Sequence, residues 1–253
     1  MKVFKSINEW RLFRNSNELS GQTLGFIPTM GALHNGHLSL MQRSKNENDK
    51  TLVSIFVNPT QFNDPKDLKK YPRTFESDLE KLKSIAVDYL LYPGYDDLYK
   101  DNYNYVIHEK ELSSKLCGSH RPGHFDGVLS VVMKLLNIAK AHKAYFGEKD
   151  YQQFLLIKGM AEAFFINTEI IPCKLIRERD GLAMSSRNTL LTEEERIIAP
   201  KFYRHLSSAK SIDAVKNNLI NDGFEIDYVE EIGRRRFGAV KLGKVRLIDN
   251  VEI

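Results

Sequence analysis

Two histidines, His34 and His37, stand three residues apart where a short apolar run gives way to a helical pattern. The run at residues 24–27 predicts a buried strand, a glycine-containing turn follows, and the apolar spacing becomes helical from about residue 37. A helix start of this kind offers free backbone N–H groups to an anion, and both imidazoles can face one bound group. The H-x-G-H pattern in this setting predicts a nucleotide phosphate site and adenylyl-transfer chemistry. A metal pair or two surface histidines are the alternatives.

Three further polar clusters each follow a predicted strand, as the histidines do. If the strands are parallel, the histidines and the next two clusters meet at the carboxyl edge of the sheet, where open α/β sheets bind ligands. Uncharged amides suit recognition of hydroxyl and carboxyl groups, whereas a guanidinium can bind phosphate bidentately. Surface ion pairing of the lysine and plain surface glutamines are the alternatives. The clusters are Asn58 with Gln61, Lys149 and Asp150 with Gln153, and Ser185 and Ser186 with Arg187.

A framework of alternating strands and helices is predicted to position these side chains. Apolar, β-branched runs predict strands at 24–27, 51–57, 89–92, 144–146 and 168–173. Amphipathic patterns predict helices at 7–15, from about 37 to the polar run 45–50, and at 74–85, 110–116, 126–140 and from 151. Asp126 is expected to be the N-cap of its helix. This alternation predicts an α/β fold with a Rossmann-like, doubly wound parallel sheet.

The C-terminal part of the chain has a different pattern. We expect residues 1–174 to form the ligand-binding sheet domain and residues 175–253 a smaller α+β domain, with short strands at 225–230 and 245–248. Thr192 followed by three glutamates predicts a capping box that opens a helix. The run Arg234-Arg235-Arg236 is expected to be a solvated face.

The composition indicates an ordinary globular chain. The sequence has 253 residues and a formal net charge of +4, which suits a small anionic substrate and does not argue for nucleic-acid binding. Its two cysteines are far apart, so a reduced, cytoplasmic setting is expected. The N-terminus leads into no signal-peptide core, and no apolar run is long enough to span a bilayer. We therefore expect neither a membrane nor a nucleic-acid partner.

Six motifs in order resemble the pantothenate synthetase (pantoate–β-alanine ligase) family of the H-x-G-H nucleotidyltransferase superfamily. Together they cover residues 24 to about 192, with a further match in the tail at residues 246–250, and six in order are highly specific. The motifs are M-G-A-L-H-N-G-H (30–37), F-V-N-P-T-Q-F (56–62), Y-P-R-T (71–74), R-P-G-H-F-D-G-V (121–128), F-G-E-K-D-Y-Q-Q (146–153) and R-D-G-L-A-M-S-S-R-N (179–188).

The resemblance implies that ATP and pantoate form pantoyl-adenylate and pyrophosphate, after which β-alanine attacks to give pantothenate and AMP. It makes His37 the nominal proton donor, and we expect His37, His34 and Lys149 to be catalytic as donors to phosphate oxygens. Pantoate is assigned to Gln61 and Gln153, with Asn58 nearby. The ATP site is assigned to Met30, Gly31, Ala32, Leu33, His34, Asn35, Gly36, His37, Gly147, Glu148, Lys149, Asp150, Ile176, Met184, Ser185, Ser186 and Arg187.

The resemblance also implies partners and an arrangement of domains. Mg²⁺ is expected to be carried on the ATP phosphates, with no metal site made by the protein. A homodimer is expected, and the C-terminal domain is expected to cover the site as a lid. The part after residue 200 reads as shorter than is usual in the family. The alternatives are another nucleotidyltransferase of the same fold, which residues 58–62 and 152–153 disfavour, and a non-catalytic nucleotide-binding or RNA-binding module.

Overall fold

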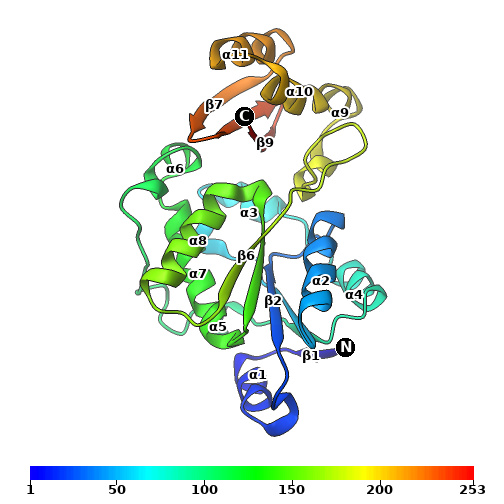
Figure 1. Ribbon diagram of the computed structural model, residues 1–253, viewed down its shortest axis with the longest axis vertical. Coiled ribbons are helices and arrows are strands. Elements are labelled where there is room, and N and C mark those ends of the chain that lie inside the picture. The colour runs from blue at the N-terminus through cyan, green and yellow to red at the C-terminus, as the bar shows by residue number, and fades with distance from the viewer.

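Two separate sheets organise the chain in the computed structural model, which describes residues 1–253 (Figure 1). The larger sheet is parallel throughout, with six strands in the order β1-β4-β3-β2-β5-β6. The smaller sheet is antiparallel, in the order β7-β8-β9. The strands are β1 (Lys2–Phe4), β2 (Leu24–Thr29), β3 (Lys50–Ile55), β4 (Tyr89–Leu91), β5 (Lys143–Gly147), β6 (Glu169–Cys173), β7 (Glu225–Ile232), β8 (Arg235–Leu242) and β9 (Val245–Glu252).

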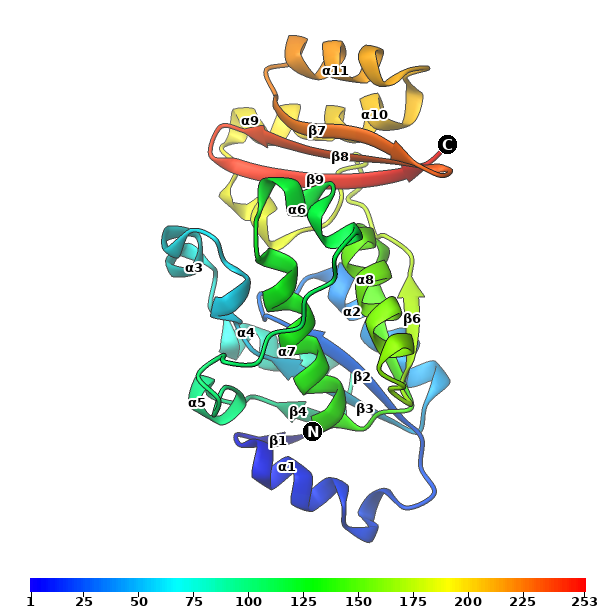
Figure 2. The ribbon, with the colours of Figure 1, turned by 90° about the vertical axis from the view of Figure 1, so that its left-hand side faces the viewer.

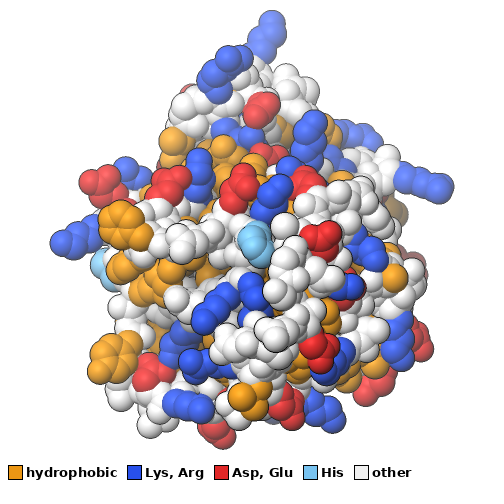
Figure 3. Space-filling view, turned by 60° about the horizontal axis from the view of Figure 1, so that its bottom comes forward, with side chains coloured by type: hydrophobic (Ala, Val, Ile, Leu, Met, Phe, Trp, Pro, Cys, Tyr) orange, Lys and Arg blue, Asp and Glu red, His pale blue; other side chains and the backbone are white.

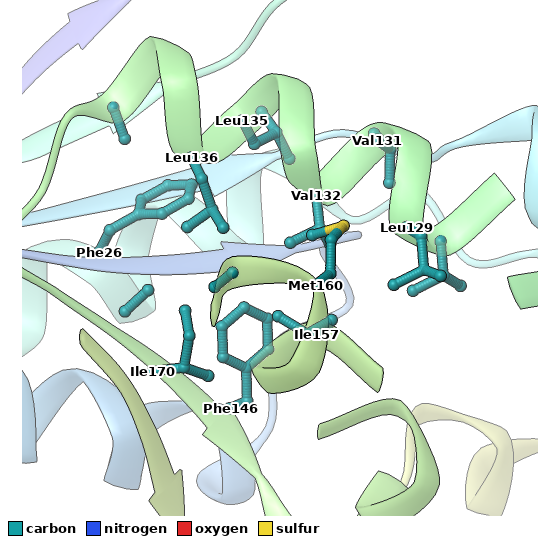
Figure 4. Close-up of a cluster of buried hydrophobic side chains, with 14 of the residues drawn as sticks. Phe26, Leu129, Val131, Val132, Leu135, Leu136, Phe146, Ile157, Met160 and Ile170 are labelled. Atoms are coloured by element: carbon teal, nitrogen blue, oxygen red, sulfur yellow. The ribbon is translucent and has the colours of Figure 1, made fainter. Parts of the chain in front are cut away.

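Helices cover both faces of the parallel sheet. Successive strand residues point to opposite faces, so Phe26 packs with α1, α7 and α8, whereas its neighbour Ile27 packs with α2 and α4 (Figure 4). This confirms the predicted doubly wound sheet. The helices are α1 (Ile7–Arg14), α2 (Asn35–Glu47), α3 (Pro65–Lys70), α4 (Phe75–Ser84), α5 (Tyr95–Leu98), α6 (Cys117–His120), α7 (His124–Ala139), α8 (Tyr151–Ala163), α9 (Glu193–Ile198), α10 (Pro200–Ser208) and α11 (Ile212–Asn221).

Some local predictions differ from the structure. The helix expected at 110–116 is only a 3-10 turn, η3 (Leu112–Ser114). Asp126 is not an N-cap, because α7 begins two residues earlier at His124, after Gly123 at a φ of 76°. The edge strand β1 was not predicted, since three residues are too few to show a period. The capping box at Thr192 is confirmed, with the Thr192 hydroxyl accepting from the Glu195 N–H.

The antiparallel sheet lies across the end of the molecule at which α6 is found (Figure 2). Helices α10 and α11 pack on its far face and share an apolar core with it, separate from the two cores of the parallel sheet. The face of the molecule drawn in Figure 3 has acidic and basic side chains intermingled, without a large area of one sign. No helix has the length and hydrophobicity that crossing a membrane requires.

The expectation that the arginine run is a solvated face is wrong for Arg235, whose side chain is 14 % exposed, and for Arg236. The Arg236 side chain is 5 % exposed, and its guanidinium donates to the carbonyl oxygens of Leu206 and Ala209 and to the Glu231 carboxylate. Arg236 therefore ties the end of α10 to the small sheet. Neighbouring residues of β8 face opposite sides of the small sheet, and both sides are covered here: Arg235 lies 3.9 Å from the Tyr151 ring centroid, and Arg236 contacts the end of α10.

We predict that Arg236→Met lowers the free energy of unfolding by about 2–3 kcal/mol, because a buried carbonyl and a part-buried one lose a charged donor. Guanidinium chloride unfolding monitored by circular dichroism measures the change. Arg234→Met is the matched control, since Arg234 is exposed and should change stability by less than about 0.5 kcal/mol. Equal effects of the two substitutions would show that the contacts of Arg236 contribute nothing specific.

Candidate functional site

The turn between β2 and α2 is held by a buried carboxylate. Asp78, from α4, is 1 % exposed and accepts the backbone N–H groups of Ala32 (2.9 Å) and Leu33 (2.7 Å) and the hydroxyl of Thr74 (3.1 Å). Gly31 and Ala32 both have positive φ, which bends the chain around this carboxylate. The sequence predicted free N–H groups here for a phosphate. In the structure, the N–H groups of Ala32 and Leu33, which lie just before the helix start, are bonded to Asp78 instead.

Both histidines are oriented by backbone N–H groups at the start of α2. His34 is the N-cap, and its Nδ1 accepts from the Gly36 N–H at 3.2 Å. His37 Nδ1 accepts from the His34 N–H at 3.4 Å. A Cβ on Gly36 would lie 2.9 Å from the His34 ring, so only glycine fits under it. Since each Nδ1 is an acceptor, the neutral rings carry their proton on Nε2 and present an N–H donor.

The surroundings keep both rings uncharged at neutral pH. The ring centroids are 4.0 Å apart. Burial, together with the charge of Lys149, lowers the pKa of His34 to about 4. Burial and the neighbouring His34 lower the pKa of His37 to about 3. A neutral Nε2–H can donate to an anion but does not carry the extra proton of a general acid at pH 7.

A buried amide network orients Gln61. Asn58 is 1 % exposed, donates to Gln61 Oε1 (3.0 Å) and to the Gly127 carbonyl (3.1 Å), and accepts from Tyr99 (2.8 Å) and Thr60 (3.0 Å). The Gln61 NH₂ group is thereby left without a partner in the chain. A Cβ on Gly127 would lie 2.4 Å from the Thr60 carbonyl oxygen, so glycine allows α7 to approach this turn. Asn58 is placed as a positioning residue beneath Gln61.

Lys149 lies on η4 (Glu148–Asp150), the turn between β5 and α8. Its ammonium is 3.8 Å from the Asp150 carboxylate. The small sheet fixes this turn, because the Asn250 side chain donates to the carbonyl oxygens of Glu148 (2.8 Å) and Lys149 (3.1 Å). Surface ion pairing of Lys149 is the alternative to a ligand-binding role. The pair with Asp150 is present, but the Lys149 side chain is only 20 % exposed.

The third cluster precedes and opens η5 (Ser186–Leu190). Ser185 is the N-cap and accepts from the Arg187 N–H at 3.2 Å. The Arg187 guanidinium donates to Asp67 of α3 at 3.0 Å. The cluster thus reaches across to a helix that follows the Gln61 turn.

One cavity of about 260 Å³ brings most of the predicted residues together. Gly31, Ala32, Leu33, Asn35 and Glu148 do not line it, and the Leu33 side chain packs in the core beneath the sheet. The predicted residues that line it are Met30, His34, Gly36, His37, Asn58, Gln61, Gly147, Lys149, Asp150, Gln153, Ile176, Met184, Ser185, Ser186 and Arg187.

A second cavity of about 300 Å³ lies between α3 and the small sheet. It shares with the first cavity the side chains of Arg121, Lys149, Asp150, Ser185 and Arg187. The two cavities therefore meet along a border that is rich in cations. We call the first the inner cavity and the second the outer cavity.

Three residues at the site were not assigned a role from the sequence. Asp78 gave no signal, because a carboxylate within an amphipathic helix looks like surface. Arg121 and His124 belong to the motif at residues 121–128. A charged residue beside glycine and proline is the only feature of that motif that could have indicated a role at the site. His124 Nδ1 lies 2.8 Å from the Gln61 carbonyl oxygen and its Nε2 lies 3.1 Å from Arg121, so both are tied to the Gln61 turn.

The parallel sheet, with the histidine pair, amides and cations at its carboxyl edge, defines an α/β nucleotide-binding enzyme of the H-x-G-H type. The model of the pantoate-beta-alanine ligase family matches residues 2–252, and the chain belongs to that family. The pantothenate synthetase of Bdellovibrio bacteriovorus is 53 % identical over all of this chain and 99 % of its own length. Relative to that protein, the region after residue 200 is not shortened.

Other relatives agree along the full chain. The pantothenate synthetase of Legionella pneumophila strain Corby is 50 % identical, with 99 % of each chain covered. A crystal structure of pantoate-beta-alanine ligase from Francisella tularensis, complexed with beta-gamma ATP and beta-alanine, has a TM-score of 0.95 and 45 % identity, and covers 100 % of this chain and 97 % of that one.

We predict that His34 and His37 are both neutral Nε2–H tautomers from about pH 5.5 to 8. Their pKa values are lowered to about 4 and 3, so the protonated form gains population only as the pH falls below about 5. ¹⁵N-detected NMR of the imidazole nitrogens measures tautomer and titration together. The exposed His108 serves as the internal control. A midpoint near 6.5 for either ring would contradict the assignment.

Proposed function

We propose that this chain joins pantoate to β-alanine with ATP through a pantoyl-adenylate, using the inner cavity for the first step. The observation that carries the proposal is the pair of neutral imidazoles whose Nδ1 atoms are both occupied and whose Nε2–H groups are therefore free to donate. The substrates are inferred from family membership, and the hydrogen-bond donors are the side chains that line the inner cavity.

In the first step, a pantoate carboxylate oxygen attacks the α-phosphorus of ATP, and the bond to the bridging oxygen breaks as pyrophosphate leaves. Negative charge spreads over the α-phosphate and the leaving group. Preorganised donors at that position stabilise the transition state without reorganising. We assign His34 and His37 to this role as N–H donors, with Lys149 as the accompanying cation; besides burial, the charge of Lys149 lowers the pKa of both rings. Ser185, Ser186 and Arg187 are proposed to hold the remaining phosphates.

Pantoate is proposed to lie against Gln61 and Gln153, which line the inner cavity. The Asn58 network leaves the Gln61 NH₂ as a donor toward the cavity, which suits a hydroxyl or carboxylate oxygen. In the second step, the β-alanine amine attacks the acyl carbon and AMP leaves. This step depends on proximity and on exclusion of water rather than on a new charged group.

Mg²⁺ is proposed to arrive as part of the ATP substrate. No group of three or more His, Cys, Asp or Glu side chains could hold a metal ion in this chain. Mg²⁺ commonly binds substrate phosphates and keeps several of its waters, so few protein ligands are needed.

We also propose a boundary near residue 175, with residues 175–253 acting as the lid of residues 1–174. The separate core of the small sheet and its contact with the Lys149 turn support this division. A homodimer is proposed from the family resemblance, to be tested by light scattering. A cytoplasmic location is proposed because both cysteines, Cys117 and Cys173, are free thiols.

We predict that pantoate alone drives exchange of labelled pyrophosphate into ATP. If the adenylate forms first, the exchange needs no β-alanine, because the amine enters only after pyrophosphate has left. Incubation with labelled pyrophosphate, with and without each substrate, is the measurement. Exchange that requires β-alanine would refute the two-step path.

We predict that His34→Ala and His37→Ala each reduce the rate of adenylation on the order of a hundredfold to a thousandfold. Affinity for ATP should fall less, because Lys149 and Arg187 remain. Acyl transfer from supplied pantoyl-adenylate should be less affected, since no pyrophosphate leaves in that step.

Single-turnover rates of both half-reactions in the folded variants test this. His108→Ala is the matched control, because His108 lies outside both cavities and pairs with Asp126. Unchanged adenylation in the His34 and His37 variants would remove both residues from the mechanism. Loss of folding in them would indicate a structural role instead.

A further inference from the structure

Arg121 is a cation at the site whose contacts are all neutral. It follows α6, and its guanidinium donates to the Gln61 carbonyl oxygen at 3.2 Å and contacts His124 Nε2 at 3.1 Å. His124 Nδ1 lies 2.8 Å from the same carbonyl, which can only accept. The Nδ1 therefore carries the His124 proton, and Nε2 accepts from Arg121. This arrangement fixes the direction of the guanidinium and leaves its other N–H groups uncommitted.

The neighbouring arginines differ from Arg121 in having carboxylate partners. Arg187 pairs with Asp67 at 3.0 Å and Arg246 pairs with Asp227 at 2.6 Å, whereas no acidic group lies within 4.0 Å of Arg121. Burial and the charges of Arg187 and Arg246 lower the pKa of Arg121 to about 10, against smaller opposing effects of Cys117 and Asp67. A half-buried cation among other cations is stabilised by an anion that enters the site.

The position of Arg121 indicates where that anion comes from. Its side chain borders both the inner cavity, which Gln61 and Gln153 line, and the outer cavity, which is lined also by the lysines and aspartates of one segment, Asp64, Lys66, Asp67 and Lys70. It is bonded to the same Gln61 residue whose side chain faces the proposed pantoate site. A molecule held by Arg121 would therefore lie beside the acyl group and extend toward the outer cavity.

The chemistry of the reaction distinguishes the candidate anions. The pantoate carboxylate loses its charge when it becomes the mixed anhydride, so it does not need a permanent cation. The ATP phosphates have Lys149 and Arg187 close to the histidine pair and the serines. The β-alanine carboxylate keeps its charge throughout and never reacts. Two methylene groups separate it from the attacking amine, so fixing the carboxylate also directs the amine.

We propose that Arg121 binds the carboxylate of β-alanine and thereby selects an amino acid over simple amines. The planar guanidinium suits this role, because it can bind both oxygens of a carboxylate. This inference rests on the proposed function and names the residue at the same site that recognises the second substrate. The carbonyl and imidazole contacts hold the guanidinium in position before the substrate arrives.

The test compares β-alanine with 3-aminopropanamide, in which an uncharged amide replaces the carboxylate, in wild type and Arg121→Met. For the variant, kcat/KM for β-alanine should fall roughly ten- to a hundredfold, the usual loss for a charged hydrogen bond. The value for the amide should change less than threefold, so the preference for the acid collapses. Pantoate-dependent pyrophosphate exchange should persist in the variant. Lys70→Met, which removes an exposed cation from the outer cavity, is the matched control and should keep the preference.

Three outcomes would overturn the inference. A parallel fall in pyrophosphate exchange would assign Arg121 to the phosphates, and equal losses for both amines would make its role structural. An effect of Lys70→Met as large as that of Arg121→Met would indicate general electrostatics. Absence of exchange in wild type would instead refute the proposed adenylation.

A measurement on the wild-type chain keeps the inference testable if Arg121→Met does not fold. Propionate has the β-alanine carbon chain and carboxylate without the amine, so it should inhibit competitively against β-alanine. In Arg121→Lys, which keeps the charge without the planar fork, this inhibition should weaken by several fold. Inhibition that is not competitive with β-alanine, or is unchanged in Arg121→Lys, would overturn the proposal.

Discussion

The carboxylate of Asp78 is the constraint on which the geometry of the site depends. It is fully buried and has no cation as a partner, and three donors from the turn and from Thr74 offset the cost of burying its charge. By accepting the N–H groups of Ala32 and Leu33, it fixes the chain where β2 becomes α2. His34 follows directly and becomes the N-cap, and the position of His37 one turn later is then determined. The backbone donors of this turn therefore shape the site, and the Nε2–H groups of the two imidazoles are left free to donate.

The small sheet completes the site from the opposite side. Asn250 of β9 holds the two carbonyls of the Lys149 turn, and the adjacent Asp249 accepts two hydrogen bonds from Arg177 at 2.6 and 2.9 Å. Arg177 lies in the connection that leads from β6 toward Ser185. One short segment of β9 thus contacts both the Lys149 turn and the connection that leads to the serine–arginine cluster, although these parts are far apart in sequence. Movement of the small sheet would alter the position of Lys149 directly.

The sequence was sufficient for five of the six parallel strands and, with the family resemblance, for most residues of the inner cavity. Strand periodicity and the turn residues at Gly31 and Asn58 are local features, so they can be recognised in a single sequence. The role of Asn58 required the structure, because only tertiary packing brings Tyr99 and Gly127 to its amide. The burial of Arg236 was also hidden, since a run of three arginines has the composition of a surface and only the β8 register separates them. The contacts of Asn250 with the carbonyls of Glu148 and Lys149 join residues 102 and 101 positions apart, so no local sequence pattern could predict them.

The histidine contacts also couple the turn to pH. An imidazole that accepts a hydrogen bond at Nδ1 loses that bond when Nδ1 is protonated, so acid disrupts both the Gly36 and the His34 N–H contacts. The folded pKa values of His34 and His37 lie below the unfolded value of 6.5, as does that of His124, at about 3. Their contribution to stability is therefore complete above pH 6.5 and declines as the pH falls toward 4 and 3. The same lowering keeps the Nε2–H groups neutral beside Lys149, where two imidazolium rings 4.0 Å apart would repel each other and the lysine. One arrangement thus supplies uncharged donors at neutral pH and makes the turn that carries them sensitive to acid.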